Sequence, residues 1–545
     1  LAQESDEARM TASRIPVYEA LSRGVSDQGV DVMFGLMGDA NLLFADHFAR
    51  QPGQTFVRTA IEGSGVLAAL AFGQGSEKIG VATVTQGPGL SNCFSALIEG
   101  VKRRAPMVLI AGDTPPNSQL TIQDLDQSQV VEATGAGFQP LTAPDTALDD
   151  LSLAFRRAQH EKRPIVLNVA SHFMDVDIDY APPARPAGPE APFVSEGADF
   201  DAALGMLASA RRPIILAGAG AIAAREELVA LAQRLEAPLA TTLKAKDLFR
   251  DQPANMGLFG TLSTPLAYEA IGTADCIAAF GASLSPFTTD QGRLFDGKRV
   301  IHISGDGADL GKCFSADAAL ASDPARTTAL FIHWLDEAEI EPSGFTAELD
   351  LEQLARYPVP QNRAQSGSKL SFVDALERLN TLLPENRVLT TDGGRFMTEV
   401  WCRVEAERPQ RFLAGADSGS IGLGLQSAIG LALAAPERCV CHFSGDGGFM
   451  MGGLTEFNTA VRLKLPMVVV VCNDAAYGAE HIQLRERGLD AATTEFDWPS
   501  FATTARALGG AGIEVASVSD WPLVEAALEQ LEGPLLIELK LHPDE

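Results

Sequence analysis

Five short, nearly continuous apolar runs place the strongest limit on the fold of this chain. They occupy residues 108–111, 214–217, 300–303, 388–391 and 467–472. Runs of this kind suit strands that are buried on both faces of a parallel sheet. Between them lie stretches with apolar residues at helical spacing, such as residues 225–235 and 373–383. The alternation predicts an α/β fold built from doubly wound parallel sheets.

Two stretches read as linkers and divide the chain into three domains. Residues 181–192 are too rich in proline for a helix or a central strand, and residues 341–368 mix Pro, Gly, Gln and Ser. The predicted domains are therefore residues 8–181, 193–340 and 369–545, each of ordinary domain size.

The first and third domains repeat one pattern of strand, glycine-rich turn, helix and second strand. In the first, the turn that ends at Gly89 precedes Pro106 by 17 positions. In the third, the turn that ends at Gly448 precedes Pro466 by 18 positions. Methionine follows the proline in both copies. The matched order and spacing indicate that the two domains arose by duplication.

The third domain carries a pattern suited to a metal held against a diphosphate. Asp446 lies in Gly-Asp-Gly at the end of one apolar run, and Asn473 ends the next. The glycines let backbone amides approach a phosphate, and hard oxygen ligands select Mg²⁺ or Ca²⁺ over zinc. A second Gly-Asp-Gly begins at Gly305, yet no Asn occurs from 308 to 360. The asparagine at this distance therefore carries the specificity.

The first domain offers a carboxylate that could complete such a site. Its glycine turn contains no acid, but Glu62 begins a Gly- and Ala-rich segment that is predicted to be helical. Glu62 could simply be an exposed glutamate at the start of a helix, where a negative charge is favourable. The duplication favours another, in which Glu62 faces a metal–diphosphate site in the related domain and the two form one composite site.

Composition restricts the partners and the compartment. The net charge of −29 disfavours nucleic acid and anionic membranes as partners. The seven cysteines are scattered, and Cys439 and Cys441 lack a second thiol pair at zinc-ligand spacing. No apolar run approaches 18 residues. We expect a cytoplasmic protein that acts on small molecules.

With these motifs in view, the whole chain resembles the thiamine-diphosphate-dependent enzymes of the acetolactate synthase and 2-oxo acid decarboxylase type. The resemblance rests on Asp446 with Asn473, on the turn Gly87-Pro88-Gly89-Leu90-Ser91-Asn92, on Gly419-Ser420-Ile421-Gly422, and on Ile122-Gln123 with Asp126-Gln127. It implies a pyrimidine-binding domain, a central Rossmann-like domain and a diphosphate- and metal-binding domain. It also implies a homodimer or homotetramer, in which Glu62 of one subunit meets Asp446 of another.

The resemblance further implies roles for individual residues. Asp446, Asn473 and the backbone carbonyl of Ala475 would bind Mg²⁺. Glu62 would be the catalytic carboxylate that hydrogen-bonds the pyrimidine nitrogen of thiamine diphosphate. Ile421 would bend the cofactor, and the Gly419 carbonyl would accept from its exocyclic nitrogen. The cofactor-binding set is Gly38, Pro88, Asn92, Gly393, Gly394, Arg395, Gly419, Ile421, Asp446, Gly447, Gly448, Asn473, Tyr477 and Gly478.

Departures from the family pattern gather on the expected substrate side. The residue before Glu62 is Ile61 rather than His, and Arg395-Phe396 replaces a Gln-His pair. The paired histidines of pyruvate decarboxylases are absent from residues 112–116. These differences argue against a plain pyruvate decarboxylase and against a standard acetolactate synthase, and they indicate an unusual substrate. The candidate substrate residues are Asp39, Gln86, Arg395, Glu480 and His481. Arg395 could equally bind a structural carboxylate, and His481 could be either a proton shuttle or a surface histidine.

Several functions remain open at this point. Carboligation of a 2-oxo acid or related carbonyl donor leads, ahead of decarboxylation without an acceptor. A nicotinamide- or flavin-dependent oxidoreductase would use the turn around Gly218 and Gly220, a weak dinucleotide signal, and FAD binding is undecided. A paralogue that binds the cofactor without catalysis is a third possibility.

Overall fold

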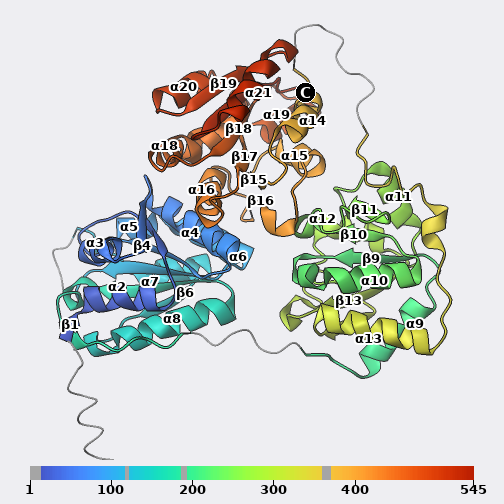
Figure 1. Ribbon diagram of the computed structural model, residues 1–545, viewed down its shortest axis with the longest axis horizontal. Helices are drawn as coiled ribbons and strands as arrows, with labels where there is room; N and C mark the ends of the chain where they lie inside the picture. The colour runs from blue at the N-terminus through green and yellow to red at the C-terminus, as the bar shows by residue number, and fades with distance from the viewer. Residues whose placement is uncertain (1–13, 117–121, 186–192, 359–369, 416, 545) are drawn as a thin grey trace, which may run out of the picture.

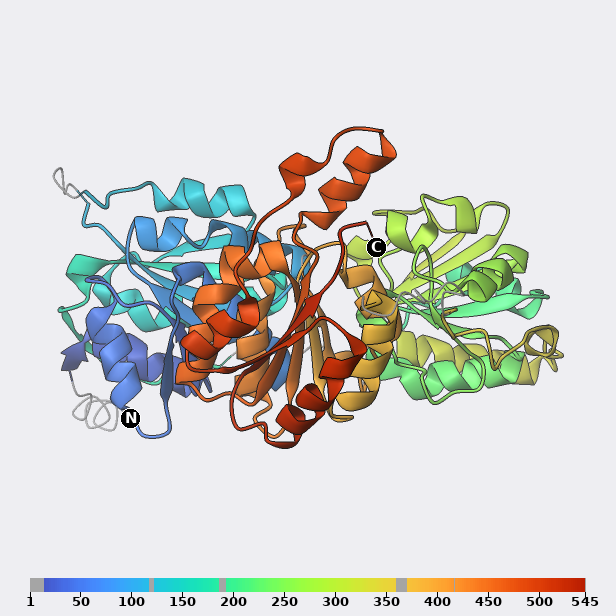
Figure 2. The same ribbon diagram turned by 90° about the horizontal axis from the view of Figure 1, so that it is seen from above.

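Three layered α/β units make up the computed structural model, which describes residues 14–116, 122–185, 193–358, 370–415 and 417–544 (Figure 1). Each unit contains one six-stranded parallel sheet with helices on both faces. The predicted fold class is confirmed. Viewed from above, the third unit lies between the first and the central one (Figure 2).

The first sheet has the strand order β3-β2-β4-β5-β7-β6. Its strands are β2 (Val32–Gly35), β3 (Thr55–Arg58), β4 (Gly80–Val84), β5 (Met107–Asp113), β6 (Gly137–Pro140) and β7 (Pro164–Ala170). The helices are α2 (Val17–Asp27), α3 (Leu42–Arg50), α4 (Glu62–Ser76), α5 (Pro88–Ser91), α6 (Phe94–Arg103), α7 (Gln127–Thr134) and α8 (Ala147–Glu161). A short antiparallel pair, β1 (Arg14–Pro16) with β8 (Asp177–Asp179), joins the two ends of this domain.

The third sheet has the order β16-β15-β17-β18-β20-β19. Its strands are β15 (Val388–Thr391), β16 (Phe412–Ala414), β17 (Val440–Gly445), β18 (Met467–Asn473), β19 (Ala511–Val515) and β20 (Leu535–Lys540). The helices are α14 (Phe372–Leu382), α15 (Met397–Arg403), α16 (Gly424–Ala434), α17 (Asp446–Gly448), α18 (Leu454–Arg462), α19 (Gly478–Glu486), α20 (Phe501–Ala507) and α21 (Trp521–Glu529). Numbered within each domain, the first and third sheets share the order 2-1-3-4-6-5, which supports duplication.

The central sheet differs from the other two. Its order, β11-β10-β9-β12-β13-β14, is 3-2-1-4-5-6 within the domain, the arrangement of dinucleotide-binding sheets. The strands are β9 (Pro213–Ala217), β10 (Leu239–Thr241), β11 (Asn255–Leu258), β12 (Cys276–Phe280), β13 (Arg299–Ser304) and β14 (Ala318–Ala321). The helices are α9 (Ala198–Ala208), α10 (Arg225–Leu235), α11 (Pro265–Thr273), α12 (Pro286–Thr289) and α13 (Pro324–Glu337).

Helices α4 and α16 hold the first and third domains together (Figure 1). Both helices are buried along most of their length. They approach closely enough that a Cβ on Gly430 would stand 2.1 Å from the carbonyl oxygen of Ala68. The same two helices begin beside the residues predicted to bind the cofactor, so this contact fixes the two half-sites that one chain carries relative to each other.

The second Gly-Asp-Gly sequence has a structural use. The carboxylate of Asp306 pairs with the guanidinium of Arg104, which also binds Asp309 at 2.8 Å. These contacts join the central domain to the first. Without an asparagine on a neighbouring strand, the motif serves as an interdomain anchor.

Candidate active site

Asp446 and Asn473 come together at one edge of the third sheet. Strands β17 and β18 are adjacent and parallel, and Gly445 pairs with Cys472 in register. Asp446 follows directly after β17, and Asn473 is the last residue of β18. Both side chains are almost fully buried. The spacing in the sequence therefore corresponds to two buried, oxygen-bearing side chains at the same edge of the sheet.

The carboxylate of Asp446 is poised for a cation. Its Oδ1 accepts from the amide of Gly447 at 2.7 Å, whereas its buried Oδ2 has no hydrogen-bond partner. Burial, followed by the negative charge of Asp474, raises the pKa of Asp446 to about 7. The indole of Trp498 lies near this carboxylate and acts to lower its pKa. A divalent cation would satisfy the orphaned oxygen and remove the cost of burying it.

The amide of Asn473 is held in one orientation. Its Nδ2 donates to Oε1 of Glu538 at 2.8 Å, and its Oδ1 accepts from the amide of Ala475 at 3.0 Å. Glu538 lies on β20 and is fully buried. Ala475 adopts a left-handed conformation (φ 55°), and its carbonyl accepts from the amide of Phe496 at 2.8 Å. One lone pair of that carbonyl is thus already engaged.

Glycines shape the floor of the site. A Cβ on Gly447 would come within 2.6 Å of the Tyr477 ring, so only glycine lets backbone and ring pack this closely. Gly419 has a φ of 81° with open space beside it, and it is exposed between β16 and α16. The backbone at Gly419 therefore has open space beside it, whereas the space beside Gly447 is taken by the Tyr477 ring.

Asp392 connects two of the expected cofactor loops. Its Oδ1 accepts from the amide of Gly393 at 2.8 Å, and its Oδ2 accepts from the amide of Gly422 at 2.9 Å. Burial raises the pKa of Asp392 to about 6 despite these donors. The carboxylate thereby fixes the loop with Gly393 and Gly394 against the loop with Ile421. The sequence did not reveal this residue, although an acid directly after a buried strand was a usable signal.

The first domain supplies the other half of the expected site. Glu62 is the first residue of α4, and its Oε2 accepts from Nδ2 of Asn92 at 3.0 Å. Pro88 begins α5, and Asn92 follows directly after the last residue of this helix. The structure thus unites Glu62 with the Gly-Pro-Gly turn. Glu62 is only partly buried within one chain.

The candidate substrate residues are dispersed. Gln86 is buried and its Nε2 donates to Oε1 of Gln123 at 3.0 Å, while the amide of Gly38 donates to Asn41 at 2.8 Å. Asp39 and Glu480 are exposed. The guanidinium of Arg395 donates to the carbonyl of Pro543 at 2.6 Å, and its side chain lies against Gly478. Arg395 therefore reaches the C-terminal segment.

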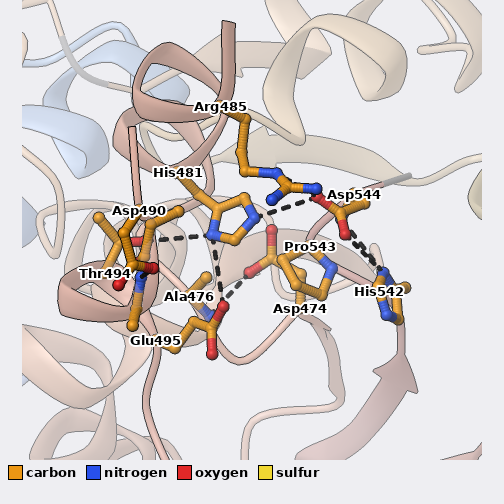
Figure 3. A network of polar contacts seen from close by, with 12 residues as sticks. Asp474, Ala476, His481, Arg485, Asp490, Thr494, Glu495, His542, Pro543 and Asp544 are labelled. Atoms are coloured by element: carbon orange, nitrogen blue, oxygen red, sulfur yellow. Dashed lines mark hydrogen bonds and ion pairs between the residues drawn. The ribbon is translucent and has the colours of Figure 1, made fainter. Parts of the chain in front are cut away.

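His481 is buried, and its ring lies between Thr494 and Asp544 (Figure 3). Its side chain is 3% exposed, Nδ1 lies 3.1 Å from the hydroxyl of Thr494, and Nε2 lies 3.2 Å from Asp544. Arg485 on the same helix approaches Asp544 at 3.5 Å. The reading of His481 as a surface histidine is wrong, because it anchors the C-terminal segment beside the loop that carries Asp474.

All three domains of the chain match the domains of one known enzyme family. Residues 15–130 match the N-terminal thiamine pyrophosphate (TPP) binding domain of thiamine pyrophosphate enzymes, residues 200–330 match their central domain, and residues 392–539 match their C-terminal TPP binding domain. The chain belongs to the thiamine pyrophosphate enzymes. It is therefore a thiamine-diphosphate-dependent enzyme of the lyase and transferase kind.

Relatives of this enzyme match along nearly their full length. A Bacillus subtilis protein described as thiamine pyrophosphate-containing is 26% identical over 96% of this chain and 91% of its own. The large subunit of acetolactate synthase isozyme 1 from Escherichia coli is 25% identical, over 98% and 95%. Sulfoacetaldehyde acetyltransferase from Castellaniella defragrans is 27% identical, over 94% and 90%. Among the described residues, no helix is both long and apolar enough to cross a bilayer.

Proposed function

We propose that this enzyme is a Mg²⁺- and thiamine-diphosphate-dependent carboligase that acts on a 2-oxo acid or a related carbonyl donor, in the manner of an acetolactate synthase. The buried, unpartnered Oδ2 of Asp446 beside Asn473 is the observation that carries the proposal. A carboxylate oxygen is rarely left buried and unpaired unless an ion or ligand completes it. We propose a cytoplasmic location as well.

The residues of the third domain suit the diphosphate end of the cofactor, and Glu62 with the Gly419 loop suits its pyrimidine end. Asp446, Asn473 and the Ala475 carbonyl would hold Mg²⁺, while Gly393, Gly394, Gly447 and Gly448 would offer amides to the diphosphate. When bound, thiamine diphosphate supplies a nucleophilic thiazolium carbon that also accepts the electrons of a broken carbon–carbon bond. The chain contributes orientation and electrostatics around that carbon.

Glu62 would carry the main proton-handling role of the protein. Held by Asn92 at the start of α4, its carboxylate would hydrogen-bond the ring nitrogen of the cofactor's pyrimidine. The Gly419 carbonyl would accept from the exocyclic nitrogen, and Ile421 would pack against both rings. Together these contacts would keep the reactive face oriented and exclude water from it.

The complete site would form between two copies of the chain. Apolar side chains flank each half-site: Ile61 is 36% exposed, Phe94 39% and Met451 58%. Ile61 precedes Glu62, Phe94 follows Asn92 closely, and Met451 lies in the turn after Asp446. Exposed apolar residues concentrated around a site mark a contact surface. A homodimer or homotetramer would cover them and shield Glu62.

Carboligation is favoured over simple decarboxylation. The named relatives include an acetolactate synthase and an acetyltransferase, and the second name describes transfer of a group to an acceptor. The pair of histidines expected in a pyruvate decarboxylase is missing after β5. A second, acceptor substrate is therefore proposed.

A substrate screen with added thiamine diphosphate and Mg²⁺ tests this function. Released CO₂ and coupled products would be followed together by mass spectrometry. We expect cofactor-dependent coupled products from a 2-oxo acid. Glu62→Ala should abolish them while cofactor binding is retained. Turnover that does not depend on thiamine diphosphate would contradict the proposal.

A further inference from the structure

Glu99 is a fully buried glutamate of the first domain whose bonds lead into the third. It lies on α6, and its Oε1 accepts from the backbone amide of Asp417 at 3.0 Å. Its Oε2 accepts from the amide of Ser418 at 2.8 Å. Both carboxylate oxygens are thus used to fix two successive amides of another domain.

The positive charge of Arg103 and two backbone donors favour the ionised form of Glu99. Burial alone would raise the pKa of Glu99, but the neighbouring Arg103 and the donors from Ser418 and Asp417 hold it below its ordinary value. Arg103, almost fully buried, pairs with Glu99 at 3.0 Å and with the Asp417 side chain at 3.4 Å. Lys244 of the central domain pairs with Asp417 at 2.6 Å. All three domains meet at this network.

The two amides that Glu99 binds belong to the loop that carries Gly419 and Ile421, two of the residues expected to contact the cofactor. Gly419 and Ile421 follow Ser418 in the same loop, and Asp392 fixes the far end of that loop at Gly422. The Gly419 backbone, with its φ of 81°, lies between these two anchors. Two buried carboxylates, one from each domain, therefore define where Gly419 and Ile421 stand.

The third domain has a similar contact in the opposite direction, made through one carboxylate oxygen, while the buried Oε2 of Glu456 has no hydrogen-bond partner. Glu456, fully buried on α18, accepts through Oε1 from the amides of Ala60 at 2.9 Å and Ile61 at 3.2 Å. Those amides immediately precede Glu62. Each clamped loop follows the corresponding edge strand, β3 in one domain and β16 in the other. The two glutamates thus act reciprocally across the duplicated pair.

From this geometry we propose that Glu99 is a positioning residue for the pyrimidine end of the cofactor site. Its buried carboxylate sets the backbone of residues 417–421 through the Asp417 and Ser418 amides. The inference rests on the proposed thiamine diphosphate site, but it makes a separate claim. Glu99 governs the wall around Gly419 and Ile421 and leaves the metal end at Asp446 unchanged.

The test compares two probes in the full-length protein. Inorganic pyrophosphate with Mg²⁺ reports the metal end alone, and thiamine diphosphate with Mg²⁺ reports both ends. Exchange of the thiazolium C2 hydrogen with D₂O, measured by NMR at saturating cofactor, reports how well the pyrimidine is placed without any substrate. The variants are Glu99→Gln, which preserves the volume of the side chain, and Glu99→Ala. Exposed Glu132 on α7 supplies the control Glu132→Gln.

We expect Glu99→Gln to bind pyrophosphate and Mg²⁺ as the wild type does. Its affinity for thiamine diphosphate and its C2 exchange rate should each fall about tenfold, the scale of losing a hydrogen bond to a charged group. Glu132→Gln should match the wild type. An unchanged exchange rate in Glu99→Gln would overturn the inference, as would an equal loss for both probes, which would indicate general destabilisation. A wild type that binds pyrophosphate but not thiamine diphosphate would instead overturn the proposed function.

Discussion

Oε1 of Glu538 accepts from Nδ2 of Asn473 at 2.8 Å across the neighbouring strands β20 and β18. A side-chain amide has a donor end and an acceptor end, and a metal can bind only the acceptor. Because Glu538 fixes the donor end, the oxygen of Asn473, which already accepts from the Ala475 amide, keeps a second lone pair for the proposed metal. Lys540 at 3.3 Å and the Ala502 amide at 3.0 Å hold Glu538 in turn.

Glu538→Gln should therefore weaken Mg²⁺ binding. The new amide can present a donor to Asn473 and loses the charge that pairs with Lys540, so the Asn473 amide is no longer fixed. We expect about a tenfold loss of apparent Mg²⁺ affinity, measured by titration in the presence of thiamine diphosphate. Glu514→Gln is the matched control, because Glu514 lies at the same register on β19 and is exposed. Equal affinities in the two variants would exclude this role for Glu538.

Asp446→Asn should raise the free energy of unfolding of the metal-free protein and at the same time abolish Mg²⁺-dependent cofactor binding. In the metal-free protein the Asp446 carboxylate is buried beside Asp474 with one oxygen unpaired. A neutral amide relieves that repulsion, so the free energy of unfolding without metal should rise by roughly 1–3 kcal/mol. Mg²⁺-dependent binding of thiamine diphosphate should be lost. Denaturant unfolding would measure the change in stability, and calorimetric titration of the same samples would measure cofactor binding. If Asp446→Asn bound thiamine diphosphate at the same Mg²⁺ concentrations as the wild type, Asp446 would not be a metal ligand.

His442 should make folding stability depend on pH. It is fully buried on β17, Nδ1 lies 2.8 Å from the hydroxyl of Thr390, and burial lowers its pKa to about 3. The unfolded imidazole titrates near 6.5, so the unfolded state binds the extra proton first. Stability should then be full above about pH 6.5 and fall by about 1.4 kcal/mol per unit as the pH drops toward 3.

Denaturant titrations at several pH values would measure this slope. His442→Gln should flatten it, while His160→Gln, at an exposed position at the end of α8, should leave it unchanged. An identical slope in the wild type and His442→Gln would show that other groups cause the acid sensitivity.

Phe94→Asp should disrupt the proposed subunit contact. Phe94 begins α6 beside Asn92 and is 39% exposed, so a carboxylate there would be buried without a partner in a dimer. We expect a lower assembly mass in light scattering together with loss of C2 hydrogen exchange. Val518→Asp, at a residue 76% exposed outside the site, is the control. A Phe94→Asp protein of unchanged mass and exchange rate would argue against this surface.

The sequence predicts those elements of the fold that depend on the spacing of apolar residues along a short segment. Apolar runs at 388–391 and 467–472 correspond to β15 and β18, and the helical spacing at 225–235 corresponds to α10. The Asp446–Asn473 pair was visible because parallel strands place their ends at one edge. Glu99 and Glu456 escaped notice because a lone acid within a helical segment looks like an exposed side chain. Their partners are backbone amides of distant loops, which no local pattern encodes.

Hydrogen exchange at C2 of bound thiamine diphosphate tests the central claim most directly. The wild-type protein with Mg²⁺ should exchange this hydrogen much faster than free thiamine diphosphate. Glu62→Ala should bind the cofactor and lose the acceleration. Wild-type protein that binds thiamine diphosphate without accelerating exchange, or Glu62→Ala that exchanges as fast as the wild type, would contradict the composite site described for this chain.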